Sequence, residues 1–128
     1  MPDFTREEIQ RALLSGTNIN LQGANLEGIN LSKLNLSGAK LSGANLRRAS
    51  LEQTNLNKAD LTGADLTGAK LSGANLSSAN LSSANLTFAD LFRAKLTKAN
   101  LLWADLTIVT LNKADLKGAT MPDGSIHK

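Results

Sequence analysis

A leucine stands at every fifth position of this chain, without interruption, from Leu21 to Leu116. The period fits neither kind of regular secondary structure. An α-helix turns about 100° per residue, so a five-residue repeat would spread the leucines around its whole circumference. A straight strand would send successive leucines to opposite faces, because five is an odd number. The chain must therefore bend once in every repeat.

Each five-residue unit combines a strand-like stretch with a bend. Two residues before each leucine stands a small or aliphatic residue, usually alanine, and the residue between them is usually Asn or Asp. Alternation places the alanine and the leucine on one face and the Asn or Asp on the other. A chain that bends in the same direction in every unit winds into a coil whose turns stack about 4.8 Å apart. We therefore expect an all-β solenoid, a parallel β-helix.

The units closely resemble the pentapeptide repeat, A(D/N)LXX, as in the segment GAKLSGANL at residues 38–46. The resemblance covers residues 19–121. It implies a right-handed quadrilateral β-helix with four units per coil and the leucine as the central inward residue. It also suggests a bacterial origin, because the family is expanded in cyanobacteria.

Four units per coil would give about five coils, a rod of roughly 24 Å in which residues twenty apart stack. The leucines would then form four interior ladders. The expected ladder residues are Leu21, Leu26, Leu31, Leu36, Leu41, Leu46, Leu51, Leu56, Leu61, Leu66, Leu71, Leu76, Leu81, Leu86, Leu91, Leu96, Leu101, Leu106, Leu111 and Leu116.

The segments before and after the repeats are expected to close the ends of the rod. Residues 1–18 contain the spacing of a helix capping box, Thr5 and Glu8, with Phe4 and Ile9 placed as a hydrophobic staple. We predict an α-helical cap from about Arg6 to Leu14, with Ile9 and Leu13 on its apolar face. After the β-helix of residues 19–121, residues 122–128 form a tail that is too short for a second helical cap. The tail or another subunit would cover the last coil.

Composition argues against an enzyme and against a cofactor. The chain has no Cys, and its one histidine, His127, lies next to the C-terminus. The Asp residues fall at outward positions on different faces, so they diverge and are expected to form no metal site. A filled interior of Leu and Ala leaves no pocket for a small-molecule substrate. No apolar run of secretory or membrane-spanning length is present, so we expect a cytoplasmic protein without a membrane contact.

The unusual surface feature is apolar. Outward positions are polar in the first three coils, and then five large apolar residues appear close together. These candidate interface residues are Phe88, Phe92, Leu102, Trp103 and Ile108. A contiguous exposed apolar patch usually marks an interface. The alternative is that these side chains shield one another or lie under the C-terminal tail.

The net charge of +3 gives only a mild basic bias, with acids and bases interspersed. Basic residues gather near one side of the last coils, at Arg93, Lys95, Lys98, Lys113 and Lys117. They lack interleaved aromatic side chains and a groove-reading helix, so nucleic acid is not an expected partner.

Two functions are compatible with these observations. The first is a non-enzymatic structural or interaction protein that presents a rigid surface to an unidentified protein partner or to itself, as a homodimer. The second comes from the resemblance, because some pentapeptide repeat proteins mimic duplex DNA, bind DNA gyrase and modulate quinolone sensitivity. Such mimicry needs a long, strongly negative surface, whereas this chain is short and basic.

Overall fold

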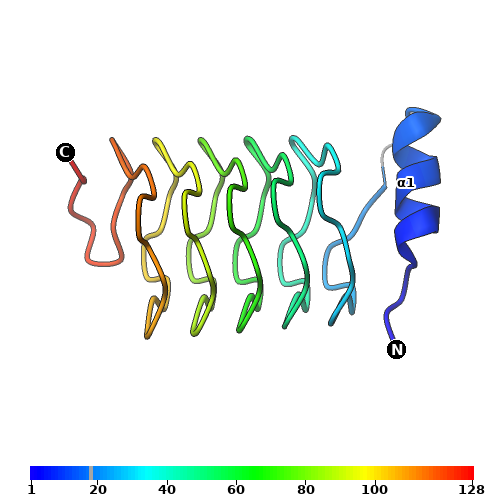
Figure 1. Ribbon diagram of the computed structural model, residues 1–128, viewed down its shortest axis with the longest axis horizontal. Coiled ribbons are helices and arrows are strands. Elements are labelled where there is room, and N and C mark those ends of the chain that lie inside the picture. Colours follow the sequence, from blue (N-terminus) through cyan, green and yellow to red (C-terminus); the bar gives the residue numbers. More distant parts are fainter. Residues whose placement is uncertain (18) are drawn as a thin grey trace.

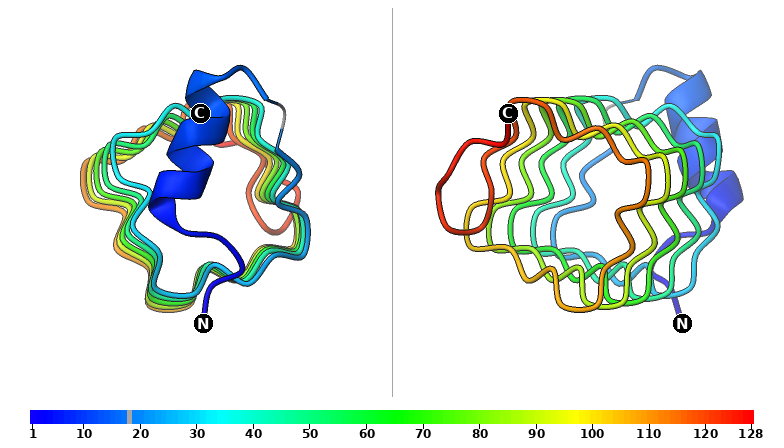
Figure 2. Two further views of the ribbon diagram at one scale, coloured as in Figure 1. Left: turned by 90° about the vertical axis from the view of Figure 1, so that its right-hand side faces the viewer. Right: turned by 60° about the vertical axis from the view of Figure 1, so that its left-hand side comes forward.

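The protein is a rod of stacked coils with one helix across its N-terminal end (Figure 1). The structure is a computed structural model that describes residues 1–17 and 19–128. The helix, α1, spans Arg6–Leu14. In the repeats, each extended segment makes isolated parallel bridges to residues twenty positions away, from Asn20↔Lys40 to Asn100↔Thr120. Figure 2 shows the coils stacked in register along one axis.

A stacking distance of twenty residues means that four five-residue units make one coil, so the rod has four sides. We number the sides by their leucine ladders. Side 1 begins at Leu21, side 2 at Leu26, side 3 at Leu31 and side 4 at Leu36. Side 2 is therefore opposite side 4. The turn that follows each leucine forms the corner to the next side.

Each unit satisfies its backbone N–H groups through a repeating pattern. In the unit Asp65–Ala69, the N–H of Asp65 donates to the preceding coil at 2.9 Å, and the N–H groups of Leu66 and Gly68 donate to the following coil at 2.7 and 2.9 Å. The N–H of Ala69 donates to the carbonyl of Leu66 at 3.0 Å, which closes the turn. Four of the five donors are thus paired with other backbone groups.

The fifth donor explains why Asn or Asp precedes most leucines. The N–H of Thr67 donates to Oδ1 of Asp65 at 3.0 Å, an Asx turn. The same bond recurs wherever Asn or Asp stands before a leucine, from Asn20 at 2.9 Å to Asp115 at 3.1 Å. The outward Asn and Asp side chains therefore complete the backbone hydrogen bonding of the unit, in addition to facing solvent.

The second residue after each leucine, which we call the turn position, adopts positive φ. Glycine occupies this position at low cost, as Gly68 does with φ of 67°. Several larger residues adopt it too, including the β-branched Ile108 with φ of 53°. A side chain with a Cβ costs roughly 1–2 kcal/mol in this region of backbone space.

The interior is filled by the leucine ladders and the alanines beside them. All ladder leucines from Leu21 to Leu101 are at most 1% exposed. The last coil differs from the sequence expectation, because Leu106, Leu111 and Leu116 are only half-buried. No further coil stacks on these three leucines, so their outer edges remain open. Thr54 is the one buried polar residue of the described core, and its hydroxyl donates to the carbonyl of Leu31 at 2.8 Å.

The N-terminal segment is bonded to the first coil. Both capping-box bonds are present, between the N–H of Glu8 and Oγ1 of Thr5 at 3.1 Å and between the N–H of Thr5 and Oε1 of Glu8 at 2.8 Å. Ile9 is fully buried, and Phe4 and Leu13 pack half-buried against the core. Arg6 donates to two first-coil carbonyls, at 3.1 Å each.

The C-terminal tail folds back on only one side of the last coil. Thr120 makes an antiparallel bridge to Ile126. The N–H of Met121 donates to the carbonyl of Ser125 at 2.7 Å, and the N–H of His127 donates to the carbonyl of Ala119 at 2.8 Å. The tail therefore pairs with residues 118–121 and leaves the leucines of sides 2, 3 and 4 partly open.

Candidate interaction surfaces

The structure offers surfaces rather than a reaction centre. Within residues 1–17 and 19–128, no three His, Asp or Glu side chains are placed to hold a metal ion. In the same described residues, no helix is long and apolar enough to cross a membrane. A shallow pocket of about 380 Å³ lies between α1 and the first coil, where Leu13, Leu14 and Leu34 supply apolar walls and Lys33 the charged group.

Three of the five candidate interface residues are strongly exposed and flank side 2. Phe88 and Ile108 lie twenty residues apart on the corner between sides 2 and 3, and they are 60% and 67% exposed. Trp103 lies on the corner between sides 1 and 2 and is 74% exposed. We call these three residues the apolar patch.

The other two candidate residues lie elsewhere. Leu102 is half-buried beside Trp103, and its Cδ1 lies 3.8 Å from the position of a Cβ at Gly124, so the tail passes over it. Phe92 is half-buried on the corner between sides 3 and 4, where the guanidinium of Arg93 lies 5.2 Å from its ring centroid. Shielding by the tail, an alternative raised by the sequence, thus applies to Leu102.

All three residues of the apolar patch occupy turn positions with positive φ. The values are 63° for Phe88, 62° for Trp103 and 53° for Ile108. The same columns carry glycine in earlier coils, for example Gly63 two coils before Trp103 and Gly68 one coil before Phe88. The chain therefore places bulky apolar side chains where glycine costs less backbone strain.

The acidic side chains are engaged in local hydrogen bonds. Asp65 is partly buried, which alone would raise its pKa, but hydrogen bonds from Thr67 and Arg47 outweigh this effect and lower the pKa. The hydroxyl and N–H of Thr107 lower the pKa of Asp105. Arg47 and Asp65 form the one ion pair found among the described residues, at 3.2 Å.

Sequence reasoning missed how these surfaces are built. The sequence predicts outward Asn and Asp side chains but did not lead us to their Asx turns, although Asn or Asp two residues before a polar residue is the usual sign of such a turn. The positive φ of the turn position was signalled by the glycines that recur there. The recurring glycines thus indicate that Phe88, Trp103 and Ile108 stand at strained backbone positions.

A four-sided parallel β-helix built from five-residue units defines the class of protein. The family model for pentapeptide repeats matches residues 9–48, 44–82 and 84–121. The chain belongs to the pentapeptide repeat family.

Solved structures agree with this assignment. A pentapeptide repeat protein, Rfr23, from the cyanobacterium Cyanothece 51142 is 31% identical, with 95% of this chain and 98% of that chain covered and a TM-score of 0.57. The pentapeptide repeat protein alr5209 from Nostoc Pcc 7120 is 42% identical, with 75% and 78% of the two chains covered and a TM-score of 0.58. The similarity establishes the right-handed quadrilateral β-helix that the sequence predicted.

A third structure shares the fold alone. A trypsin-treated form of QnrB1, a plasmid-mediated fluoroquinolone resistance protein, matches with a TM-score of 0.72 at 19% identity, covering 82% of this chain and 51% of that chain. No curated protein matches this chain.

Proposed function

We propose that this protein is a non-enzymatic interaction protein that binds another protein molecule through the apolar patch on the two corners of side 2. The bound molecule is either a second copy of the chain or a different protein. The rigid β-helix serves as the support that holds Phe88, Trp103 and Ile108 at set positions.

The observation that carries this proposal is the combination of exposure and strain in the patch. Exposed apolar side chains lower the solubility of the free protein. A Cβ at positive φ also lowers its folding stability, so each of the three side chains has two costs. Glycine at the same positions in other coils supports the same turn without either cost. Binding would compensate by burying the three side chains.

We also propose that α1 and the tail act as end caps of a β-helix of about five coils. The burial of Ile9 and the bonds from Arg6 to first-coil carbonyls support this role for α1. A cap prevents the open strand edges of the first coil from pairing with other chains.

Size-exclusion chromatography with light scattering tests the patch. The wild type is compared with a Phe88→Ser/Trp103→Ser variant and with a Gln53→Ala/Ser78→Ala control, whose changes lie at turn positions on the corners of side 4. If the patch mediates self-association, the wild type and the control are dimers and the patch variant is a folded monomer.

If the wild type is a monomer, the partner is a different protein, and photo-crosslinking in the native cell is the decisive step. A photoreactive residue at position 103 should give one discrete adduct, which disappears when Phe88 and Ile108 are both changed to Ser. A photoreactive residue at position 78 should give none. A monomer that forms no discrete adduct from position 103 would refute the proposal.

The alternative of a DNA-mimicking gyrase modulator is not favoured by the charges. DNA mimicry requires regular negative charge along the rod. This chain carries a net charge of +3, and half of its Lys and Arg residues lie on one side of the rod or on the corners of that side. The similarity to QnrB1 concerns the fold alone.

A further inference from the structure

The modest net charge of the chain conceals a strong asymmetry between the sides of the rod. Five cations lie on side 4 or on its two corners in the fourth and fifth coils: Arg93, Lys95, Lys98, Lys113 and Lys117. Stacking at twenty residues adds Lys33 and Lys58 from earlier coils to the same side. Glu52 and Asp115 are the acidic residues there. This cationic side therefore has seven positive charges and two negative charges, a net charge of +5.

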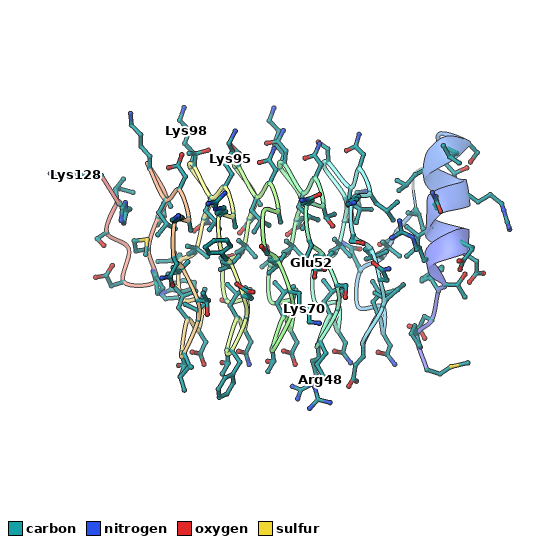
Figure 3. The ribbon with its side chains drawn as sticks, viewed as in Figure 1. Arg48, Glu52, Lys70, Lys95, Lys98 and Lys128 are labelled. Atoms are coloured by element: carbon teal, nitrogen blue, oxygen red, sulfur yellow. The ribbon has the colours of Figure 1, made fainter. Side chains whose placement is uncertain are left out.

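The rest of the chain has the opposite sign. It contains the other seven of the 14 Lys and Arg residues and nine of the 11 Asp and Glu residues, a net charge of −2. All seven cations of the cationic side are exposed. None of them takes part in the ion pair between Arg47 and Asp65. Figure 3 shows Lys95 and Lys98 projecting from one side of the rod and Arg48, from the column of Phe88 and Ile108, from the other.

The cations occupy positions where the fold favours other residues. Lys33, Lys58, Arg93, Lys98 and Lys113 all stand at turn positions, with φ between 57° and 65°. Lys95 stands at the position where Asn75, one coil earlier, accepts the N–H of Ser77 at 3.0 Å. Lysine has no acceptor for such a bond. As in the apolar patch, the side chains at these positions are not those that the backbone requires.

Contrary to the expectation from the sequence, we propose that the cationic side binds the phosphate backbone of double-stranded nucleic acid without reading its base sequence. The cations extend over four coil steps, about 19 Å along the rod. A duplex carries about one negative charge per 1.7 Å of axis, so a segment of that length offers roughly eleven phosphates. Five of the cations lie in two columns parallel to the rod axis, with Lys33, Arg93 and Lys113 in one and Lys58 and Lys98 in the other. This extended arrangement suits the charge along a duplex better than a single cluster of acidic side chains.

The same side lacks the elements that read bases or hold single strands. Its nearest aromatic side chain is Phe92, which is half-buried and has the Arg93 guanidinium 5.2 Å from its ring centroid. The ring face next to Arg93 is thus not open for stacking with an unpaired base. The helix α1 lies across the N-terminal end of the rod, where its C-terminal half lines a pocket with Lys33, and it does not extend along the later coils that carry most of the cations (Figure 1).

This binding surface is distinct from the apolar patch. The patch lies on the corners of side 2, and side 2 is opposite side 4. A duplex on the cationic side would leave Phe88, Trp103 and Ile108 accessible. The protein could then hold a nucleic acid and a protein partner at the same time, one on each side of the rod.

Fluorescence anisotropy with a labelled duplex of mixed sequence, roughly 20 base pairs long, tests the proposal at about 50 and about 200 mM salt. The wild-type chain is expected to bind, with a slope of log K against log salt that approaches about −6 when seven phosphates are neutralised. The test variant is Arg93→Gly/Lys95→Asn/Lys98→Gly. It should bind at least about tenfold more weakly at the lower salt, with a slope less steep by about 2.7.

A matched control removes the same number of charges from other sides. Arg48→Gly/Lys40→Asn/Lys70→Asn makes the same kinds of change at the same positions of the unit, and it leaves the same net charge as the test variant. The control should retain most of the affinity and the slope of the wild type. Phe88→Ser/Trp103→Ser should also bind the duplex as the wild type does.

Three results would overturn the proposal. The first is no binding of the duplex by the wild type at the lower salt. The second is an equal loss in the test and control variants, which would mean that net charge rather than side 4 determines binding. The third is stronger binding of labelled polyglutamate or of phosphatidylserine vesicles than of the duplex, which would assign the side to an acidic protein or a membrane surface.

Discussion

At the scale of the residue, two positions in each unit have different physical roles. The residue before the leucine accepts a backbone N–H in an Asx turn, so Asn or Asp contributes to stability there. The turn position has positive φ, where any side chain larger than glycine adds strain. Departures from the repeat consensus at either position are therefore not explained by the stability of the fold.

The Asx turn should be measurable in single substitutions. Asn75→Ala removes the acceptor of the Ser77 N–H and should lower the free energy of unfolding by about 1 kcal/mol. Lys70→Asn supplies an acceptor and should raise it by a similar amount. Urea denaturation followed by circular dichroism measures both changes. If both substitutions changed the free energy of unfolding in the same direction, the outward side chain would act only through solvation.

The lowered pKa values of Asp65, Asp105 and Asp123 predict a loss of stability in acid. Each carboxylate has a lower pKa in the folded chain than the ordinary 3.8, because side-chain and backbone hydrogen bonds favour its charged form. Their stabilisation is complete above the unfolded value and is lost as the pH falls below it, through the lowered pKa. Thermal melts from pH 6 down to about pH 2 should show this loss.

The control for this acid effect replaces the three carboxylates with amides. Asn occupies the same position at Asn45 and Asn85 and makes the same turn bond. The Asp65→Asn/Asp105→Asn/Asp123→Asn variant should therefore fold and show a flatter decline below the ordinary pKa of 3.8. If the stability of this variant declined in acid as steeply as that of the wild type, other groups would control the pH dependence of stability.

At the scale of the element, a coil gains its stability from the coils on both sides of it. Ladder leucines in the middle of the rod are fully buried, whereas Leu106, Leu111 and Leu116 in the last coil are half-buried. The strand edges of the first coil are bonded by the N-terminal segment, and those of the last coil are paired by the tail on one side only. The two ends of the rod therefore contribute unequally to stability.

Leucine truncation should reveal this gradient. Leu66→Ala should lower the free energy of unfolding by about 2–5 kcal/mol, because it opens a cavity between two stacked coils. Leu111→Ala should cost less than about 2 kcal/mol, since its side chain is already partly in contact with water. Lys58→Ala serves as the surface control. Similar losses at Leu66 and Lys58 would contradict the inward register of the ladder.

The contact of α1 with the first coil should be equally measurable. Ile9 is fully buried, so Ile9→Ala should cost about 2–5 kcal/mol. Leu14, on the same helix, is 83% exposed, and Leu14→Ala should have little effect. Amide hydrogen exchange should show faster exchange in the first coil of the Ile9 variant. An Ile9 variant as stable as the wild type would mean that the helix is not a cap.

At the scale of the whole molecule, the five-residue leucine period predicted the β-helix, because few backbones can bury every fifth residue. The helix was predictable from Thr5 and Glu8, which form the capping box that is observed. The surfaces were harder to predict. The stacking of residues twenty apart was predictable from the resemblance and places Lys33 and Lys58 with the later cations, whereas the positive φ at their positions was not predicted. The path of the tail over Leu102 depends on a turn at Gly124 that spacing alone does not define.

The residues that build the rod are distinct from those to which we assign binding. Interior leucines and alanines, Asx acceptors and glycines at turn positions are sufficient for the fold. The apolar patch and most of the cationic side consist of turn-position side chains that the fold does not need. Substitutions at such positions change the surface of the rod while the core stays the same.

The most direct test of this separation is the unfolding free energy of a variant with five changes: Phe88→Gly, Arg93→Gly, Lys98→Gly, Trp103→Gly and Ile108→Gly. Each change relieves a positive-φ side chain at roughly 1–2 kcal/mol and adds about 0.5–1 kcal/mol of chain entropy to the unfolded state. The account predicts that the variant is as stable as the wild type or more stable in urea denaturation. A loss of more than about 2 kcal/mol would show that these side chains pack as part of the fold, and would contradict the account.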